Sequence, residues 1–215
     1  MSISNPANIL ANATDSAVKV EKSIDIQVSM VDELVARTKQ GDEKSRTKAW
    51  LSAPDIGAVA IKALCELMAE GELEVARAAK RGLWKIVRHA GRPRAGDEKN
   101  EVIAELISLL GTEQPISVSR EVLWMLSEIG GDESVSPIAD ALSNKYLRED
   151  ARMALERIPG KKSLAALEAS LKTAPEDFKL NIAQSLRQRS VKVRGLACMK
   201  LVPTKKTNVK PIRSE

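Results

Sequence analysis

The sequence predicts an all-α fold, a right-handed superhelical stack of about four to five helical hairpins. Three observations predict it. A helix, Gly-Gly, helix unit at residues 118–142 recurs along the chain, and one such hairpin cannot bury its own apolar face. Aromatic residues make up only 2% of the 215 residues. Alanine and leucine are plentiful, which suits close helix packing and disfavours a fold rich in sheet.

The unit at residues 118–142 defines the register of the repeat, with Leu126 as its anchor. Apolar residues before and after this anchor fall on one helical face: Val118, Val122, Met125 and Ile129. Gly130-Gly131 is expected to end this helix in the left-handed conformation, and the second helix is expected to begin near Pro137. The inner face of the second helix is expected to consist of Val135, Ile138 and Leu142.

The same register recurs in four other places, anchored at Leu51 (a weaker copy), Leu83, Leu155 and Leu186. A second anchor stands 16 residues after the first in three copies, at Leu67, Leu142 and Leu171. From Leu83 the matching residue is Leu110, 27 residues on, so this hairpin carries an 11-residue insertion. In the last copy, Arg189 replaces the final apolar residue.

The ends of the chain differ from the repeats. Residues 1–25 are expected to be disordered, because they are rich in Asn, Ser and Ala without periodicity. The solenoid is expected to span residues 26–190. It should begin with an amphipathic helix from Ile26 to Lys39, which ends at Gly41 and covers the open end of the stack. The inward residues of this helix are expected to be Val28, Val31, Leu34 and Val35.

Residues 191–215 are expected to form a basic extended tail. Residues 190–215 carry seven Lys or Arg residues and one acid, which gives them a charge of +6 in a chain of net charge +5. The alternation Val-Lys-Val-Arg at 191–194 is typical of a short extended segment. Such a tail can dock on nucleic acid or on an acidic protein, or it can serve solubility alone.

The repeat resembles a known family. An apolar-x-Arg triplet opens three of the first helices (VAR at 75–77, VSR at 118–120, YLR at 146–148), followed by small-Leu and then Ile-Gly or Ile-Pro-Gly. This pattern resembles HEAT repeats, in particular the short bacterial variety first described in phycobilin lyases. The resemblance covers roughly residues 42–190 and implies an α-solenoid. The family includes scaffolds, lyases, phosphatase subunits and one class of DNA glycosylase, so its members differ in function.

A row of basic side chains marks the second hairpin, where no acid occurs between Val75 and Gly96. Four of them step by 4, 4 and 3 residues along one helical face, and two more follow in the inserted loop. We name these six residues the basic stripe and take them as candidate binding residues: Arg77, Arg81, Lys85, Arg88, Arg92 and Arg94. The stripe either binds an anion or is a solvated face paired with acids such as Glu74, Glu98 and Glu121.

The sequence carries no motif for catalysis, a metal or a cofactor. The single histidine, His89, excludes a multi-histidine metal site, and no Cys-x-x-Cys, Walker or Gly-x-Ser-x-Gly motif occurs. Trp124 and Glu128 share a helical face, which is similar to the aromatic and carboxylate pair of HEAT-like alkylpurine DNA glycosylases. That family uses an aspartate with further Trp and Arg partners. In this sequence the acid is a glutamate, Glu128, which argues against glycosylase activity. The tryptophans Trp50, Trp84 and Trp124 are expected to pack between repeats.

No run of about 18 apolar residues occurs, and the N-terminus does not resemble a signal peptide, so we expect a cytoplasmic protein without a membrane span. Two cysteines, Cys65 and Cys198, do not make a disulfide framework, which fits a reducing compartment.

The sequence therefore favours a non-enzymatic interaction module or scaffold that binds a protein partner on the solenoid surface. The alternative is a nucleic-acid or phosphate-binding module that uses the basic stripe and the basic tail. A lyase or a DNA glycosylase is a remote alternative.

Overall fold

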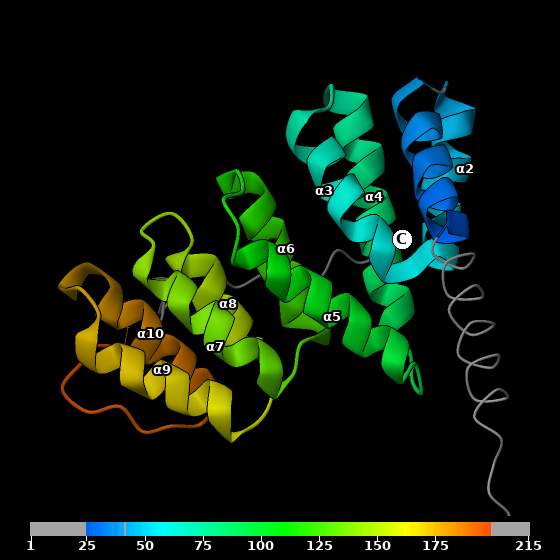
Figure 1. Cartoon of the computed structure of the whole chain (residues 1–215). Coiled ribbons are helices and arrows are strands. Elements are labelled where there is room, and N and C mark those ends of the chain that lie inside the picture. The colour runs from blue at the N-terminus through cyan, green and yellow to red at the C-terminus, as the bar shows by residue number, and fades with distance from the viewer. Residues whose placement is uncertain (1–24, 41, 199–215) are drawn as a thin grey trace, which may run out of the picture.

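The computed structural model describes residues 25–40 and 42–198, and these residues form an α-solenoid (Figure 1). Its helices are residues 25–40, α2 (Glu43–Ile56), α3 (Ile61–Glu70), α4 (Leu73–Ala90), α5 (Asp97–Leu110), α6 (Ile116–Ile129), α7 (Val135–Asp140), α8 (Arg148–Arg157), α9 (Lys161–Thr173) and α10 (Glu176–Gln188). Short 3-10 turns cover Gly57–Ala60, Asp132–Ser134 and Ala141–Ser143. Within the described ranges no strand occurs, and the predicted all-α fold is confirmed.

The helices pair into four stacked hairpins: α2 with α3, α4 with α5, α6 with α7, and α8 with α9. The first helices of the hairpins contact one another in order and end with α10; we name α2, α4, α6, α8 and α10 the A layer. The second helices, α3, α5, α7 and α9, form the B layer in the same way. The repeats therefore bury their apolar faces against their neighbours, as the sequence predicts.

The core follows the predicted register in four of the five repeats. The anchors Leu83, Leu126, Leu155 and Leu186 expose at most 1% of their surface. Each buried leucine contributes about 1.5–3 kcal/mol by leaving water. The core is one continuous cluster that runs from Leu34 to Leu186.

The prediction that Leu51 anchors the first repeat is wrong. Leu51 is 50% exposed, whereas Ala49 and Ala53 are fully buried. Ala53 faces Gly82 of α4, where an added Cβ would stand 3.5 Å from the Ala53 Cβ and 3.3 Å from a methyl of Leu64. Small residues on both helices let α2 approach α4 closely, and a leucine side chain has no room at that contact.

The prediction of a left-handed stop at Gly130-Gly131 is also wrong, because both residues are extended, with φ of −63° and −121°. Gly130 donates its N–H to the carbonyl of Leu126 at 2.8 Å and so closes the last turn of α6. A Cβ on Gly130 would lie 2.5 Å from that carbonyl oxygen and 2.8 Å from Ser134 Oγ. Glycine is therefore needed for space, and α7 begins at Val135, two residues earlier than expected.

The insertion in the second hairpin is divided between a loop and a longer α4. Residues 91–96 form a largely exposed loop. In addition, α4 continues seven residues past Leu83, whereas α6 ends three residues past Leu126. Val87 and Ala90 in this added length are fully buried, so part of the insertion belongs to the core.

The helix over residues 25–40 packs beside the first hairpin at the N-terminal end of the described stack (Figure 1). Leu34 is 3% exposed, and Val31 and Val35 pack against the core. The prediction that Val28 faces inward is wrong, because it is 54% exposed. Gly41, the expected stop, lies outside the described residues.

Residues 191–198 leave α10 without regular structure. Val191 and Val193 pack against the core while Lys192 and Arg194 are exposed, which matches the predicted alternation. The rest of the basic tail (residues 199–215) and residues 1–24 of the N-terminal segment lie outside the described residues. No helix in residues 25–40 and 42–198 is both long enough and apolar enough for a membrane crossing.

Arg189, which interrupts the apolar pattern of the last repeat, holds the end of α10 to the preceding hairpin. Its guanidinium donates to the carbonyls of Leu155 and Ile158, each at 3.0 Å, and to that of Gly160 at 2.7 Å. It also donates to Ser163 Oγ at 2.8 Å. One side chain therefore satisfies carbonyls at the C-terminal end of α8, which have no partner within that helix.

Candidate functional site

Helices α4 and α6 of the A layer are joined by a cation and a tryptophan that share one acid. Lys80 of α4 forms an ion pair with Glu121 of α6. The indole N–H of Trp84, one turn further along α4, donates to the other oxygen of the same carboxylate at 3.0 Å. Each oxygen of Glu121 thus receives one donor from the preceding repeat.

The same arrangement joins α6 to α8. Arg120 Nε lies 3.0 Å from Asp150 Oδ2, and the indole N–H of Trp124 donates to Asp150 Oδ1 at 3.0 Å. In both helices the cation stands four residues before the tryptophan, so the two side chains share a face. The acid stands five residues before its own anchor, as Glu121 before Leu126 and Asp150 before Leu155. We name this arrangement the cation–tryptophan–acid bridge.

The bridge is incomplete between α2 and α4. Trp50 of α2 follows Arg46 by four residues, as the pattern requires, but the acid position, five residues before Leu83, is occupied by Ala78. Arg46 Nε instead donates to the carbonyl of Thr38 at 3.2 Å. The N–H of Trp50 has no acceptor among the described residues, and its side chain lines a surface cleft.

At this incomplete bridge the surface of α4 next to α2 is hollowed into a cleft of about 560 Å³. We name it the Trp50 cleft, and its lining residues are Trp50, Arg77, Lys80, Arg81, Trp84, Lys85 and Arg88. An adjoining cavity of about 360 Å³ shares Trp50, Arg77 and Arg81 with the cleft and reaches Ala78. The two spaces together expose Trp50 and the cations of α4 to any molecule that approaches this part of the A layer.

Three cations of the Trp50 cleft lie over its indole rings. Arg81 Cζ and Lys85 Nζ lie 5.9 Å and 5.6 Å from the centre of the Trp50 ring, and Arg88 Cζ lies 5.4 Å from that of Trp84. Such contacts are worth roughly 0.5–1 kcal/mol each at exposed sites. Within residues 25–40 and 42–198, these three cations form no salt bridge, unlike their neighbours on α4.

The basic stripe is therefore divided by the structure. Arg77, Arg81, Lys85 and Arg88 line the Trp50 cleft together, although Arg77 also pairs with Glu74 at 2.7 Å.

The other two residues of the stripe, Arg92 and Arg94, lie outside the cleft in the inserted loop. Arg92 pairs with Glu98 at 2.6 Å, and this hydrogen bond lowers the pKa of the Glu98 carboxyl. Arg94 is exposed, with a positive φ of 67°. If the stripe is a solvated face, basic residues should pair with nearby acids. Such pairs occur between Arg77 and Glu74, between Arg92 and Glu98, and between Lys80 and Glu121.

Sequence reasoning did not place Trp50, Trp84 or Lys80 at the candidate site. The expected packing between repeats is found for Trp84 and Trp124, whose indoles bond to the next A-layer helix. Trp50 instead lines the cleft. The recurrence of a cation four residues before each tryptophan is the signal in the sequence that points to these residues.

The residues considered for catalysis contact separate partners. Trp124 donates to Asp150, whereas Glu128 lies 3.5 Å from Arg157. His89 lies at the exposed end of α4, with Nε2 3.5 Å from Glu98. In the part of the chain that the structure describes, no cluster of three or more His, Cys, Asp or Glu side chains is arranged to hold a metal ion.

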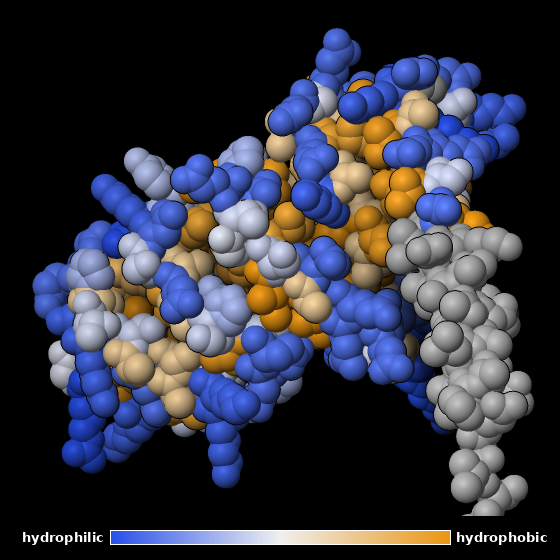
Figure 2. Space-filling view, in the orientation of Figure 1, coloured by the Kyte–Doolittle hydropathy of each residue, from blue (hydrophilic) through white to orange (hydrophobic). Residues whose placement is uncertain are grey.

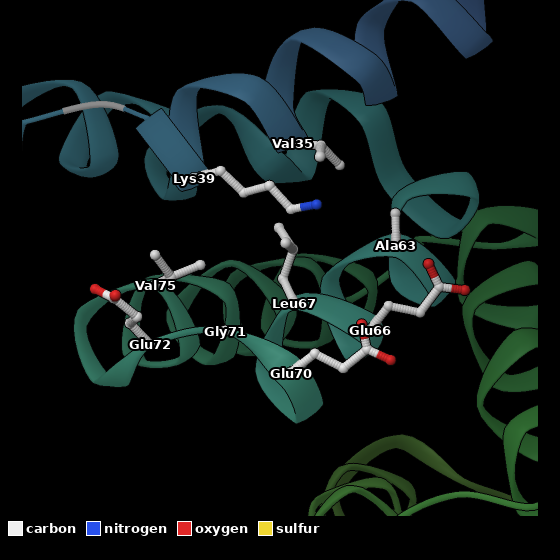
Figure 3. Close-up of a pocket in the computed structure, with 9 residues that line it drawn as sticks. All are labelled: Val35, Lys39, Ala63, Glu66, Leu67, Glu70, Gly71, Glu72 and Val75. Atoms are coloured by element: carbon white, nitrogen blue, oxygen red, sulfur yellow. The ribbon is translucent and has the colours of Figure 1, made fainter.

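A separate cavity, of about 460 Å³, lies between the helix over residues 25–40 and α3 (Figure 3). Leu67 rises from its floor towards Lys39, and carboxylates stand at its rim (Figure 3). Its charged lining residues are Lys39, Glu66, Glu70 and Glu72. Hydrophilic side chains dominate the edges of the face in Figure 2, with apolar groups between them over the central helices. The charge of this cavity is opposite to that of the Trp50 cleft.

Residues 61–156, which run from α3 into α8, match the family model described as HEAT repeats. A comparison with curated proteins found no match. Among solved structures, the chain is similar to a designed armadillo repeat protein in complex with the peptide (KR)4. The two share 18% sequence identity over 72% of this chain and 80% of that chain, with a TM-score of 0.40.

Proposed function

We propose that this chain, a HEAT-like repeat protein, is a non-enzymatic interaction module that binds an acidic segment of a partner protein in the Trp50 cleft. Solenoids of this kind are typical of protein-interaction scaffolds, because stacked repeats present an extended surface. One observation carries the proposal. Arg81, Lys85 and Arg88 are gathered at the cleft without a carboxylate partner in the described part of the chain.

The indole rings explain how α4 accepts this row of cations. Like charges four residues apart on a helix destabilise it by some tenths of a kcal/mol per pair. The rings of Trp50 and Trp84 offset that cost and hold the cationic groups in place before any partner arrives. Tryptophan and arginine are also the residues most enriched at the energetic centres of protein interfaces. A partner segment with acidic side chains would match the cations of the cleft, and apolar side chains next to those acids would match its indole rings.

Nucleic acid is the alternative ligand for the cleft, and the cations of α4 support it. Three features favour a protein segment instead. The Trp50 and Trp84 rings already have cations over them, and these cations compete with stacked bases for the ring faces that they cover. Arg77 and Lys80 are paired with acids, and the loop residues Arg92 and Arg94 lie outside the cleft. Among the described residues that line the cleft, three cations remain without an ion-pair partner, and a duplex that they bind would show a slope of log affinity against log salt of about −2.7.

The proposal is tested with a fluorescein-labelled octaglutamate peptide, whose binding is followed by fluorescence anisotropy at low ionic strength. The wild-type protein should bind it, and Arg81→Glu/Lys85→Glu should weaken binding at least tenfold because two of the cations that line the cleft become acids. Lys161→Glu/Lys172→Glu is the matched control. It makes the same change of net charge at two exposed residues of α9 that form no ion pair with another described residue.

Three outcomes decide the matter. Loss of peptide binding in the cleft variant alone supports the proposal. Equal loss in both variants shows that only net charge matters, and absence of binding by the wild-type protein rejects the cleft as an acidic-peptide site. A twelve-residue oligothymidylate, titrated in parallel, should bind more weakly than the peptide. Tighter binding of the oligonucleotide, lost in the cleft variant, would instead support the nucleic-acid alternative.

We further propose a reducing, cytoplasmic setting for this interaction. Cys65 is buried in α3 and Cys198 is exposed, and neither is in a disulfide. Free thiols of this kind are kept in reducing compartments.

A further inference from the structure

We propose that a carboxylate of the partner takes the place of the acid that α4 lacks at Ala78, and so completes the bridge between α2 and α4. This inference rests on the proposed function, because it names the chemical group that enters the Trp50 cleft and the atoms that receive it.

Ala78, Glu121 and Asp150 occupy equivalent positions in three successive repeats. Glu121 and Asp150 each stand five residues before an anchor leucine, and each accepts one indole N–H and one cation from the preceding A-layer helix. Ala78 stands five residues before Leu83. Between α2 and α4, the position that holds an acid in the other two bridges therefore holds only the methyl group of Ala78.

The second step is that the donors for such an acid remain in place. Trp50 and Arg46 keep the spacing of the other two pairs, and both line the cavity of about 360 Å³ that reaches Ala78. Arg81 lines the same cavity. No hydrogen bond joins the Trp50 N–H to an acceptor among the described residues, and the Trp50 side chain lines the cavity. Space, a neutral donor and positive charge thus lie together beside Ala78, although Glu43 and Glu74 line other parts of the same cavity.

The third step is the choice of a carboxylate. In each complete bridge the two donors use different oxygens of one planar group, as with Oδ1 and Oδ2 of Asp150. An Asp or Glu side chain of a partner can reproduce this division, with Trp50 on one oxygen and a guanidinium on the other. The partner would then be held by the same set of contacts that hold consecutive repeats to each other.

The experiment supplies the missing acid within the chain. Ala78→Glu should place a carboxylate beside Trp50 and exclude that of the partner, which should weaken octaglutamate binding at least tenfold. Ala78→Gln fills the same space without a charge, so it should weaken binding less than Ala78→Glu does. The melting temperature of each variant reports whether the α2–α4 contact survives the substitution.

A direct readout comes from the indole signals in a ¹H–¹⁵N NMR spectrum, which number three because the chain has three tryptophans. Trp50→Phe identifies the Trp50 signal. Its proton should move downfield when octaglutamate is added to the wild-type protein, while those of Trp84 and Trp124 stay in place. In Ala78→Glu the Trp50 signal should be shifted without any peptide.

The outcomes separate this inference from the proposed function. If octaglutamate binds but the Trp50 signal does not move, or if Ala78→Glu binds as tightly as Ala78→Gln, the inference is overturned and the proposed function stands. If the wild-type protein does not bind the peptide, both fall. Should Ala78→Glu fail to fold, the wild-type titration of the Trp50 signal decides alone.

Discussion

Leu126 lies at the centre of the core with none of its surface exposed, whereas half of the surface of Leu51 faces solvent. Replacing Leu126 by alanine should lower the free energy of unfolding by about 2–5 kcal/mol, because a cavity remains where the side chain packed. Leu51→Ala is the matched control and should change it by less than about 0.5 kcal/mol. Urea denaturation measures both. Equal losses in the two variants would show that α2 and α6 use the same register after all.

The two thiols should differ in reactivity. Burial in α3 raises the pKa of Cys65 to about 12, so its thiol stays protonated and unreactive at pH 8. Cys198 is exposed. An aromatic disulfide reagent at pH 8 should therefore modify one thiol per folded chain, and two after denaturation. Rapid modification of both thiols in the folded protein would show that α3 does not protect Cys65.

Single residues also show where reasoning from local pattern ends. The sequence treats Arg189 as a break in the apolar register, but its guanidinium donates to carbonyls in and after α8, about 30 residues away. Trp50 and Ala78 are a similar case. Their importance comes from the pairing of α2 with α4, and it appears only when three repeats are compared position by position. A 3.6-residue pattern carries no information about such contacts between helices.

At the level of helices, periodicity predicted most elements because each A-layer helix is buried along one face. It failed where packing is set by small residues. Ala53 of α2 meets Gly82 of α4, and no leucine pattern signals that contact. The Gly-Gly break was predicted at the right place but with the wrong conformation, because glycine is required there by the approach of Ser134 rather than by a positive φ.

The close contacts around Gly130 can be tested by substitution. Gly130→Ala should lower the free energy of unfolding by about 1–3 kcal/mol, because its Cβ would overlap the Leu126 carbonyl and Ser134. Gly111→Ala at the end of α5 is the control. It has a φ of −82° and no Cβ contact closer than 3.5 Å, so it should be neutral or slightly stabilising. Thermal unfolding compares the two, and an undisturbed Gly130→Ala protein would argue against the tight turn between α6 and α7.

At the scale of the whole molecule, the solenoid carries two concave surfaces of opposite charge near its N-terminal end. The sequence predicted four residues of the basic one, because Arg77, Arg81, Lys85 and Arg88 share a face of a single helix. It did not predict the acidic cavity, which is closed by a separate helix, residues 25–40. Surfaces assembled from several elements become visible only when the elements are placed together.

If the Trp50 cleft binds an acidic segment of a protein partner, affinity capture from an extract of the native host, with and without nuclease treatment, will detect that partner. Three baits are compared: the wild-type protein, Arg81→Glu/Lys85→Glu and Lys161→Glu/Lys172→Glu. We expect a protein with an acidic segment that is retained by the wild type and by the α9 control after nuclease treatment, is released by salt, and is lost from the cleft variant. Capture of the same proteins by all three baits, or loss of every partner on nuclease treatment, would contradict it.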